Sequence, residues 1–282
     1  MLYSCQTCHL ASRLGINAAV DAMLDAGYPA LDISLFGNNG FMLAEDWRDT
    51  AKALRAKAET RGAVFNQAHA PFGGGYEHYT KNLIPTFPRA FEFCEELGVR
   101  QIVVHPLQQG RYYGRERELF DMNMDFYRSL VPLSDKHGIR IAIENMWQRN
   151  QYNKNIVSSV CSSPYELRDY VDSCNGIAPV FTACLDIGHC LLTGHDPANA
   201  IRVLGDRLEC LHVHDVDGIN DNHTCPMTMK VDFPAVMEAL WEVGYKGEFT
   251  LEADYFYNHF TKEQYPFAAK QLASVSKLLV TP

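Results

Sequence analysis

Acidic residues and histidines close several apolar segments of this sequence. His69 ends the segment FNQAH, and His105 ends the segment IVVH. The arrangement recurs in four later segments, which are closed by Glu144, by Asp186, by His212 with His214, and by Glu252. A single residue of this kind is often only a helix cap or a hydrogen-bonded polar group. The same placement in six successive segments predicts one shared site.

Three carboxylates and one imidazole from these segments form an oxygen-rich set of metal ligands: Glu144, Asp186, His212 and Glu252. Such a set favours six-coordinate Mn²⁺, Mg²⁺ or Co²⁺. The other imidazoles in these segments leave Zn²⁺ open as well. The sequence therefore predicts a divalent metal ion without selecting among these four. The stretch LHVHDVDGINDNH adds Asp221 and His223 as two further residues able to bind a metal.

Eight short runs of apolar or β-branched residues alternate with longer amphipathic stretches. The expected strands are Leu2–Cys5, Ala30–Ser34, Ala63–Ala68, Gln101–His105, Ile139–Glu144, Val180–Leu185, Leu208–His214 and Glu248–Ala253. Expected helices include Ala44–Arg61, Phe87–Leu97, Glu116–His137 and Phe233–Val243. This alternation predicts an α/β fold, a (β/α)₈ TIM barrel, in which the C-terminal strand ends meet at one face. A doubly wound open sheet is the alternative, but no G-x-G-x-x-G motif follows the first strand.

No break in composition divides the chain, so we expect a single domain over residues 1–282. The polar segment Gln148–Ser162 is expected to form a loop over the barrel mouth, and Gly73–Gly75 a second, mobile loop. Tyr76, Trp147 and Lys230 are weaker candidates for contacts with a ligand.

The composition restricts the partners of this chain. Lys and Arg number 25 against 34 Asp and Glu, a formal charge of −9, which argues against nucleic acid as the main partner. Nine cysteines in apolar surroundings indicate reduced thiols and a cytoplasmic location. No apolar run is long enough to span a bilayer, so we expect no membrane partner.

Several segments together resemble one known superfamily. The most specific are CLDIGHCLLTGHDP and LHVHDV, supported by AHAP, VVHP and GYKGEFTLEAD. They are similar to the xylose-isomerase-like TIM barrels, which comprise sugar and sugar-phosphate isomerases and epimerases, inosose dehydratases and endonuclease IV. The resemblance covers nearly the whole chain. It implies a metal-dependent isomerase or epimerase of a small sugar or sugar phosphate, and it is compatible with a homo-oligomer.

The resemblance also assigns roles to residues. It implies that Glu144, Asp186, His212 and Glu252 bind the metal, that Glu144 and Glu252 form the acid/base pair, and that His189 contacts substrate oxygens. In the endonucleases of the superfamily, the positions of His69, His105, His189, Asp221 and His223 hold additional zinc ions. His214 is expected to face the substrate or to support a ligand.

Three functions remain open at this stage besides the isomerase. They are an abasic-site endonuclease with a multinuclear zinc site, an inosose or keto-sugar dehydratase, and a non-catalytic binding barrel. Asp217-Gly218-Ile219 stand where ketohexose epimerases typically carry an arginine, which argues against that substrate class. A nuclease would also need cationic loops, and the basic-aromatic cluster Arg111–Arg117 is short and interrupted by Glu116.

Overall fold

Eight parallel strands form a closed barrel in the computed structural model, which describes residues 1–37 and 40–281. They are β1 (Tyr3–Cys5), β2 (Ala30–Ser34), β3 (Val64–His69), β4 (Gln101–Val104), β5 (Arg140–Glu144), β8 (Phe181–Asp186), β9 (Leu208–His212) and β10 (Phe249–Leu251). Strands β2 to β9 pair in sequence order, and β1 pairs with β10. Single bridges, Gln6 to Asp32 and Val213 to Leu251, join the two sheets into a ring. All eight expected strands are present, and the predicted TIM barrel is confirmed.

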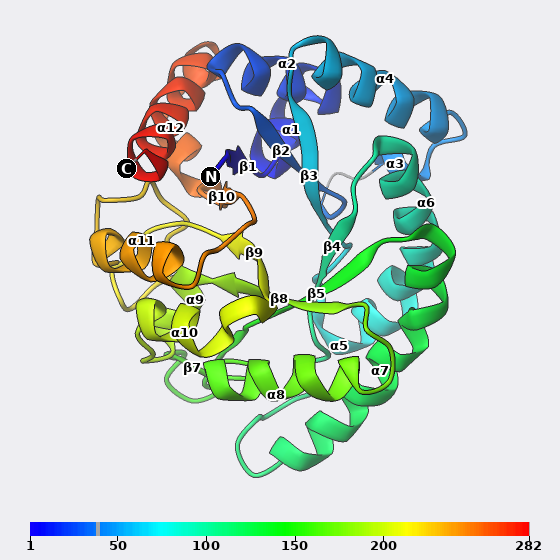
Figure 1. Ribbon diagram of the computed structural model, residues 1–282, viewed down its shortest axis with the longest axis vertical. Coiled ribbons are helices and arrows are strands. Elements are labelled where there is room, and N and C mark those ends of the chain that lie inside the picture. The colour runs from blue at the N-terminus through cyan, green and yellow to red at the C-terminus, as the bar shows by residue number, and fades with distance from the viewer. Residues whose placement is uncertain (38–39, 282) are drawn as a thin grey trace.

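Helices surround the strands and face the solvent on their outer sides (Figure 1). The longer ones are α2 (Ile16–Ala26), α4 (Trp47–Thr60), α6 (Phe87–Leu97), α7 (Glu116–His137), α8 (Pro164–Asn175), α10 (Pro197–Leu204), α11 (Phe233–Glu242) and α12 (Tyr265–Val280). The shorter ones are α1 (Cys8–Leu14), α3 (Gly40–Leu43), α5 (Gly75–His78), α9 (Ile187–Leu192), the π-helix η1 (Tyr79–Leu83) and the 3₁₀-helices η2 (Ile84–Thr86), η3 (Gly205–Arg207), η4 (Asp254–His259) and η5 (Lys262–Gln264). The four helices named from the sequence are all present, two of them with the expected bounds.

Local sequence signals explain where these helices start and stop. The side chain of Asp196 accepts a hydrogen bond from the Asn199 amide at the start of α10, and Pro197 occupies the first helical position. Helix α6 ends at Gly98, whose φ of +88° lies in the left-handed region. Capped in this way, the helices pack their apolar faces against the outside of the barrel, where Phe91 and Tyr127 are fully buried.

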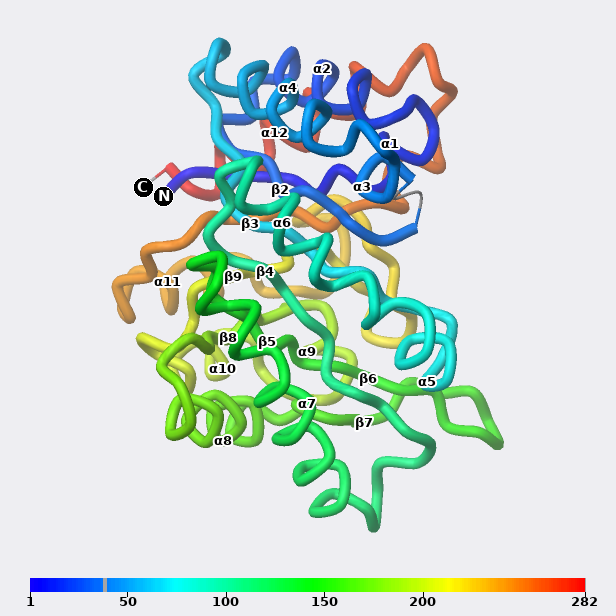
Figure 2. Tube along the Cα trace, turned by 90° about the vertical axis from the view of Figure 1, so that its right-hand side faces the viewer, coloured from blue at the N-terminus to red at the C-terminus, as the bar shows by residue number. Residues whose placement is uncertain are grey.

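The segment Gln148–Ser162 differs from the expected loop. Strand β6 (Trp147–Arg149) pairs with β7 (Ile156–Ser158) as an antiparallel hairpin. Its turn is stabilised by the Asn150 side chain, which accepts hydrogen bonds from two following backbone amides. The loop prediction was wrong here because two strands of three residues are too short to show an alternating pattern. The hairpin and α5 lie at the end of the barrel opposite both termini (Figure 2).

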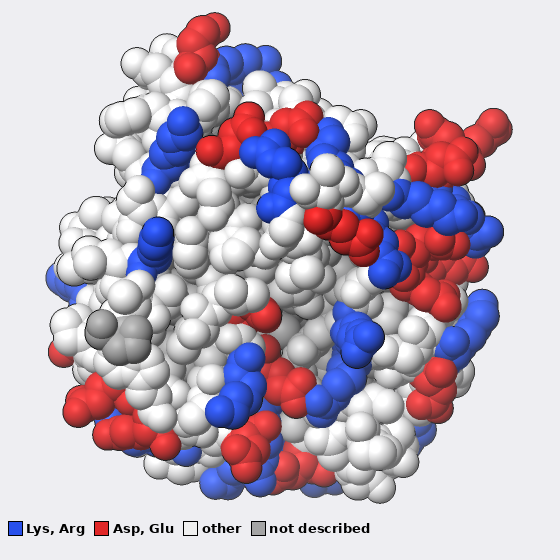
Figure 3. All heavy atoms as spheres, turned by 45° about the horizontal axis from the view of Figure 1, so that its top comes forward, with Lys and Arg blue, Asp and Glu red and all other residues white. Residues whose placement is uncertain are grey.

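The surface carries charges of both signs. On the face shown in Figure 3, lysines and arginines are interleaved with aspartates and glutamates, so neither sign forms a continuous patch there. All nine cysteines are free, as expected for reduced thiols. Among the described residues, no helix combines the length and apolarity that crossing a bilayer would need.

Candidate metal and substrate site

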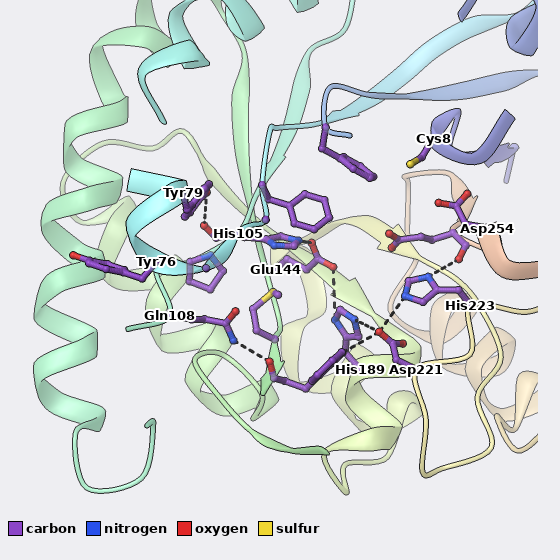
Figure 4. Close-up of a pocket in the computed structure, with 18 of the residues that line it drawn as sticks. Cys8, Tyr76, Tyr79, His105, Gln108, Glu144, His189, Asp221, His223 and Asp254 are labelled. Atoms are coloured by element: carbon purple, nitrogen blue, oxygen red, sulfur yellow. Dashed lines mark hydrogen bonds and ion pairs between the residues drawn. The ribbon is translucent and has the colours of Figure 1, made fainter. Parts of the chain in front are cut away.

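The C-terminal strand ends bring the ten candidate residues together beside one pocket of about 500 Å³ (Figure 4). Together they form three groups, defined below, in which every potential ligand atom lies within 4.8 Å of the others of its group. The pocket opens at the barrel face that carries α5 and the β6–β7 hairpin, because Tyr76 and Trp147 both line it.

The first group, called the central group, consists of Glu144, Asp186, His212 and Glu252. The Nδ1 atom of His212 lies 3.0 Å from Glu144 Oε1 and 3.0 Å from Glu252 Oε2. All four side chains are buried, yet Glu144 and Glu252 also line the pocket. Asp186 and His212 are not among the lining residues, so the two glutamates are the members that a substrate could touch.

The second group, His69, His105 and Glu144, shares its glutamate with the central group. Glu144 Oε2 lies 2.9 Å from His105 Nε2 and 3.3 Å from His69 Nε2. The two histidine nitrogens are 3.0 Å apart. One carboxylate therefore offers each of its oxygens to a different group, an arrangement that allows Glu144 to bridge two cations.

The third group consists of His189, His214, Asp221 and His223. Asp221 Oδ2 lies 3.1 Å from His223 Nε2 and 3.5 Å from His189 Nε2. His214 Nε2 lies 3.0 Å from Asp186 Oδ1, and His214 does not line the pocket. Of the two positions expected for His214, the one behind the ligands agrees with this geometry. His214 links the third group to the central group.

Three of the histidines hold one ring nitrogen against the backbone. Nδ1 of His69, His189 and His223 lies within hydrogen-bond distance of a carbonyl oxygen. The accepting residues are Ala70, Asn145 and Glu252, each at 2.9 Å. When Nδ1 donates this bond, neutral imidazole leaves Nε2 with a free lone pair, which is how metal-binding histidines are usually oriented. In each case Nε2 faces a carboxylate of its group.

The residues present fit divalent cations. Ligand atoms within 4.8 Å of one another can all lie 2.0–2.5 Å from one ion, the range of zinc and calcium bonds. The three buried carboxylates of the central group suit Mn²⁺, Mg²⁺ or Co²⁺, whereas the imidazole-rich second and third groups suit Zn²⁺. Asp221 Oδ1 is buried without a hydrogen-bond partner, so a lone pair is available for a cation.

Burial and neighbouring charges set the protonation of this site. Burial opposes ionisation of Glu144, but His212 and His105 outweigh it and hold the pKa of Glu144 well below its usual range. Burial likewise opposes protonation of His189, yet the carboxylates of Asp186 and Asp221 raise its pKa well above the ordinary value. With no cation in the third group, Glu144 is an ionised acceptor facing the pocket and His189 is a protonated donor beside it. A cation bound by the third group would take the lone pair of His189 Nε2 and displace this proton.

Two sets of side chains line the pocket. The titratable lining is His105, Glu144, His189, Asp221, His223, Glu252 and Asp254. The aromatic lining is Phe36, Phe72, Tyr76, Tyr79, Trp147 and Tyr255. Sequence analysis named Tyr76 and Trp147 but missed the other aromatic residues, and Lys230 is not among the lining residues.

Asp254 and Cys8 are two further lining residues that sequence analysis missed. Asp254 follows Glu252 by two positions, so strand alternation could have placed both side chains on the same side. Burial and the nearby Glu252 carboxylate raise the pKa of Asp254 to about 7. Cys8 lies next to it, at the end of the pocket away from Tyr76 (Figure 4). The C-x-x-C-H spacing of Cys5, Cys8 and His9 sets Cys8 apart in the sequence but does not place it in this pocket.

A closed (β/α)₈ barrel with acids and histidines at its C-terminal strand ends defines the class of this protein. The profile of the family described as "Xylose isomerase-like TIM barrel" matches residues 20–274, and the chain belongs to this family. The resemblance inferred from the sequence is thereby confirmed.

Individual relatives are more distant. An uncharacterized protein of Methanocaldococcus jannaschii is 28% identical over 194 residues, which cover 65% of this chain and 62% of that protein. The solved structure of a D-psicose 3-epimerase in the presence of D-fructose is 12% identical with a TM-score of 0.76, covering 99% of both chains. The IOLI protein with a binding zinc atom is 19% identical with a TM-score of 0.72, covering 99% of this chain and 96% of that one. Both structures show the same fold.

Proposed function

We propose that this protein is a metal-dependent sugar isomerase or epimerase that moves a proton at the carbon next to a carbonyl group. One observation carries the proposal. Glu144 and Glu252 each place a carboxylate oxygen 3.0 Å from His212 Nδ1, and both line the pocket. Two carboxylates positioned in this way can serve as a base and an acid toward one bound substrate. The similarity in fold to a D-psicose 3-epimerase supports the same reaction class.

Each residue then has a distinct role. Glu144, Asp186, His212 and Glu252 would hold the divalent ion. When bound, such an ion would supply Lewis-acid polarisation of the carbonyl group, which makes the neighbouring C–H more acidic. One of Glu144 and Glu252, as the carboxylate, takes the proton from carbon, and the other, as the carboxylic acid, gives its own proton to the opposite face or to the neighbouring carbon. His189 donates a hydrogen bond to the oxygen on which charge develops.

Proton exchange in deuterated water tests this proposal. The metal-loaded protein is incubated with candidate ketoses, and deuterium at carbon is followed by NMR. We expect exchange that requires the metal and that is lost in Glu144→Gln, which keeps the side-chain shape but cannot accept the proton. Full exchange in that variant would rule out the role of Glu144.

If the sugar loses water after the proton is removed, instead of regaining a proton, the protein is a dehydratase. The same proton abstraction is then followed by departure of a hydroxide. The product distinguishes the two reactions: an isomerase conserves the mass of the sugar, and a dehydratase lowers it by one water. Deuterium exchange and mass spectrometry on one sample therefore separate them.

A multinuclear phosphodiesterase, such as an abasic-site endonuclease, is the second candidate. It is favoured by the three groups, since every ligand position of a three-zinc site is assembled around one pocket. The charge of the pocket argues against it, because none of the described lining residues is Lys or Arg, which a phosphate backbone would require. A nicking assay on abasic duplex DNA, with and without chelator, decides the question: metal-dependent nicking would replace the isomerase proposal.

A further inference from the structure

The pocket combines a polar centre with aromatic side chains around it. Tyr76, Tyr79 and Gln108 lie on one side of Glu144, and His223, Asp254 and Cys8 lie on the other (Figure 4). A substrate held at Glu144 therefore has room to extend toward the aromatic side. The volume of about 500 Å³ is within the range of pockets that enclose drug-sized ligands.

Phe36 and Phe72 are the aromatic lining residues that connect, through His105, to the carboxylate of Glu144. Their ring centroids are 4.4 Å apart, and the Phe72 ring lies 4.2 Å from that of His105. His105 Nε2 in turn lies 2.9 Å from Glu144 Oε2. A sugar bound at Glu144 would thus be in reach of both phenyl rings, and any substituent on it would continue along them.

Three polar atoms of the aromatic lining are directed at other protein groups. The Tyr79 hydroxyl donates to the His105 carbonyl oxygen, and the Trp147 indole N–H donates to Asp221. The Tyr76 hydroxyl faces the sulfur of Met122 at 3.8 Å. These side chains offer the cavity mainly hydrocarbon faces. A second polar sugar placed there would lose hydrogen bonds to water without replacing them, whereas an apolar ring would bury favourable contact area.

The described lining gives an anionic substituent no lysine or arginine as a partner. The titratable lining contains four carboxylates, and none of the described lining residues is Lys or Arg. Arg111 and Arg149 line a separate hollow. Arg149 lies over the Trp147 ring at 5.3 Å and donates to the Lys154 carbonyl oxygen, so Trp147 stands between it and the pocket. A phosphate bound beside Glu144 would find no lysine or arginine of the described lining to pair with.

We infer that the substrate is an uncharged keto-sugar carrying an apolar ring substituent, that is, a glycoside with an aryl-type aglycone. This inference rests on the proposed isomerase function. The keto-sugar lies against Glu144 and Glu252, and the aglycone lies against Phe36, Phe72 and Tyr76. The isolated sugar and its phosphate are poorer substrates, since neither fills the aromatic side.

Matched substrates test the inference. The metal-loaded protein is given phenyl 3-keto-β-glucoside, methyl 3-keto-β-glucoside, D-fructose and D-fructose 6-phosphate, and solvent deuterium uptake and binding by calorimetry are both measured. We expect kcat/KM for the phenyl glycoside to exceed that for the methyl glycoside by about tenfold or more, as expected for a buried aromatic contact. Equal values for the two glycosides, or the highest value for fructose 6-phosphate, would overturn the inference and leave the isomerase function standing.

Binding separates the two possible failures. If the phenyl glycoside binds about tenfold more tightly than the methyl glycoside but no compound exchanges, the isomerase function fails while the aromatic subsite is supported. If the phenyl glycoside binds no more tightly than the methyl glycoside, the subsite is rejected whatever the exchange rate.

Substitution at Tyr76 locates the effect. Tyr76 is chosen because its hydroxyl donates to the sulfur of Met122, which lies outside all three metal-binding groups. Tyr76→Ala is expected to lower the phenyl-to-methyl ratio of kcat/KM several-fold. The matched control is Tyr152→Ala, since Tyr152 is 86% exposed and lines only the separate hollow. An unchanged ratio in folded Tyr76→Ala, or an equal fall in Tyr152→Ala, would contradict the placement of the aglycone, and the ratio in the unmodified protein remains decisive if Tyr76→Ala fails to fold.

Discussion

The strand-end acids and the aromatic lining meet in one pocket but come from different parts of the fold. The rest of the titratable lining lies beyond the strand ends, with His189 in α9, Asp221 and His223 in the loop after β9, and Asp254 in η4. Glu144 ends a barrel strand, and His105 and Glu252 each follow one directly. The aromatic side chains all lie outside the barrel strands, in the loops, short helices and hairpin that follow them. In TIM barrels the strand ends supply the reacting groups and the loops vary between proteins. The proposed acid/base chemistry therefore depends mainly on the barrel strands, and the proposed substrate selectivity depends on the loops.

The largest effect is expected from a substitution at a strand end, that of Glu144. Glu144→Gln is expected to lower deuterium exchange by at least about a thousandfold, within the range of general acid–base catalysis. Because the reacting group is removed, the loss should be similar for every substrate. Steady-state exchange rates with two different keto-sugars measure it. Glu116→Gln, on the exposed start of α7, is the matched control and should have no effect. A loss of exchange with only one of the two keto-sugars would show that Glu144 sets selectivity, which we assign to the loops.

The strand-end residues are also the part of the site that sequence analysis predicted. An apolar strand has a recognisable run, so the acid or histidine that closes it can be located without knowing the packing. His69, Glu144 and Asp186 were all found in this way and lie within one site. The barrel fold needed only the count and alternation of such runs.

The aromatic lining was mostly missed because loops lack periodicity. Phe36 and Phe72 carry no signal that distinguishes them from core phenylalanines, and only the folded loops bring them within 4.4 Å of each other. The β6–β7 hairpin was missed for a similar reason: strands of three residues show no pattern, and their pairing depends on the turn between them. Contacts between loops are set by packing, which a single sequence does not display.

Removal of the metal should have the next largest effect, which is a loss of stability of the folded protein. A cation that binds only the folded state, present at about a thousand times its Kd, stabilises that state by about 4 kcal/mol. We therefore expect chelation to lower the Tm by on the order of 10 °C. Thermal unfolding with and without chelator measures the shift, and readdition of Mn²⁺, Co²⁺, Mg²⁺ or Zn²⁺ shows which ion restores it. A Tm that does not respond to any of these ions would contradict a metal site.

Asp221 combines the two properties, because it is a titratable residue of the pocket but comes from the loop after β9. Asp221→Asn removes the only carboxylate of the third group while leaving the central group complete. We expect the metal content per chain to fall by one ion if the third group is occupied, with deuterium exchange lowered by less than about tenfold. Elemental analysis of both proteins gives the count. A loss of exchange as large as that of Glu144→Gln would show that a loop residue takes part in the chemistry.

The smallest effect concerns a carboxyl group that anchors the loops without reaching the pocket. Glu166 Oε2 accepts hydrogen bonds from the Tyr112 hydroxyl and the Cys161 amide, at 2.9 and 3.0 Å. Burial raises the pKa of Glu166 to about 7. Since the folded state prefers the protonated acid, its ionisation destabilises the protein above pH 7, and this cost disappears as the pH falls through 7 toward 4.5.

Glu166→Gln keeps an accepting oxygen but cannot ionise. The variant should therefore be more stable than the unmodified protein at pH 8, by about 1–3 kcal/mol, and equally stable near pH 4.5. Urea unfolding at the two pH values measures the difference. Because Glu166 belongs to none of the three metal-binding groups, metal content should not change. A change in metal content would mean that Glu166 and the strand-end ligands are coupled. The loops and the strand ends would then not act independently.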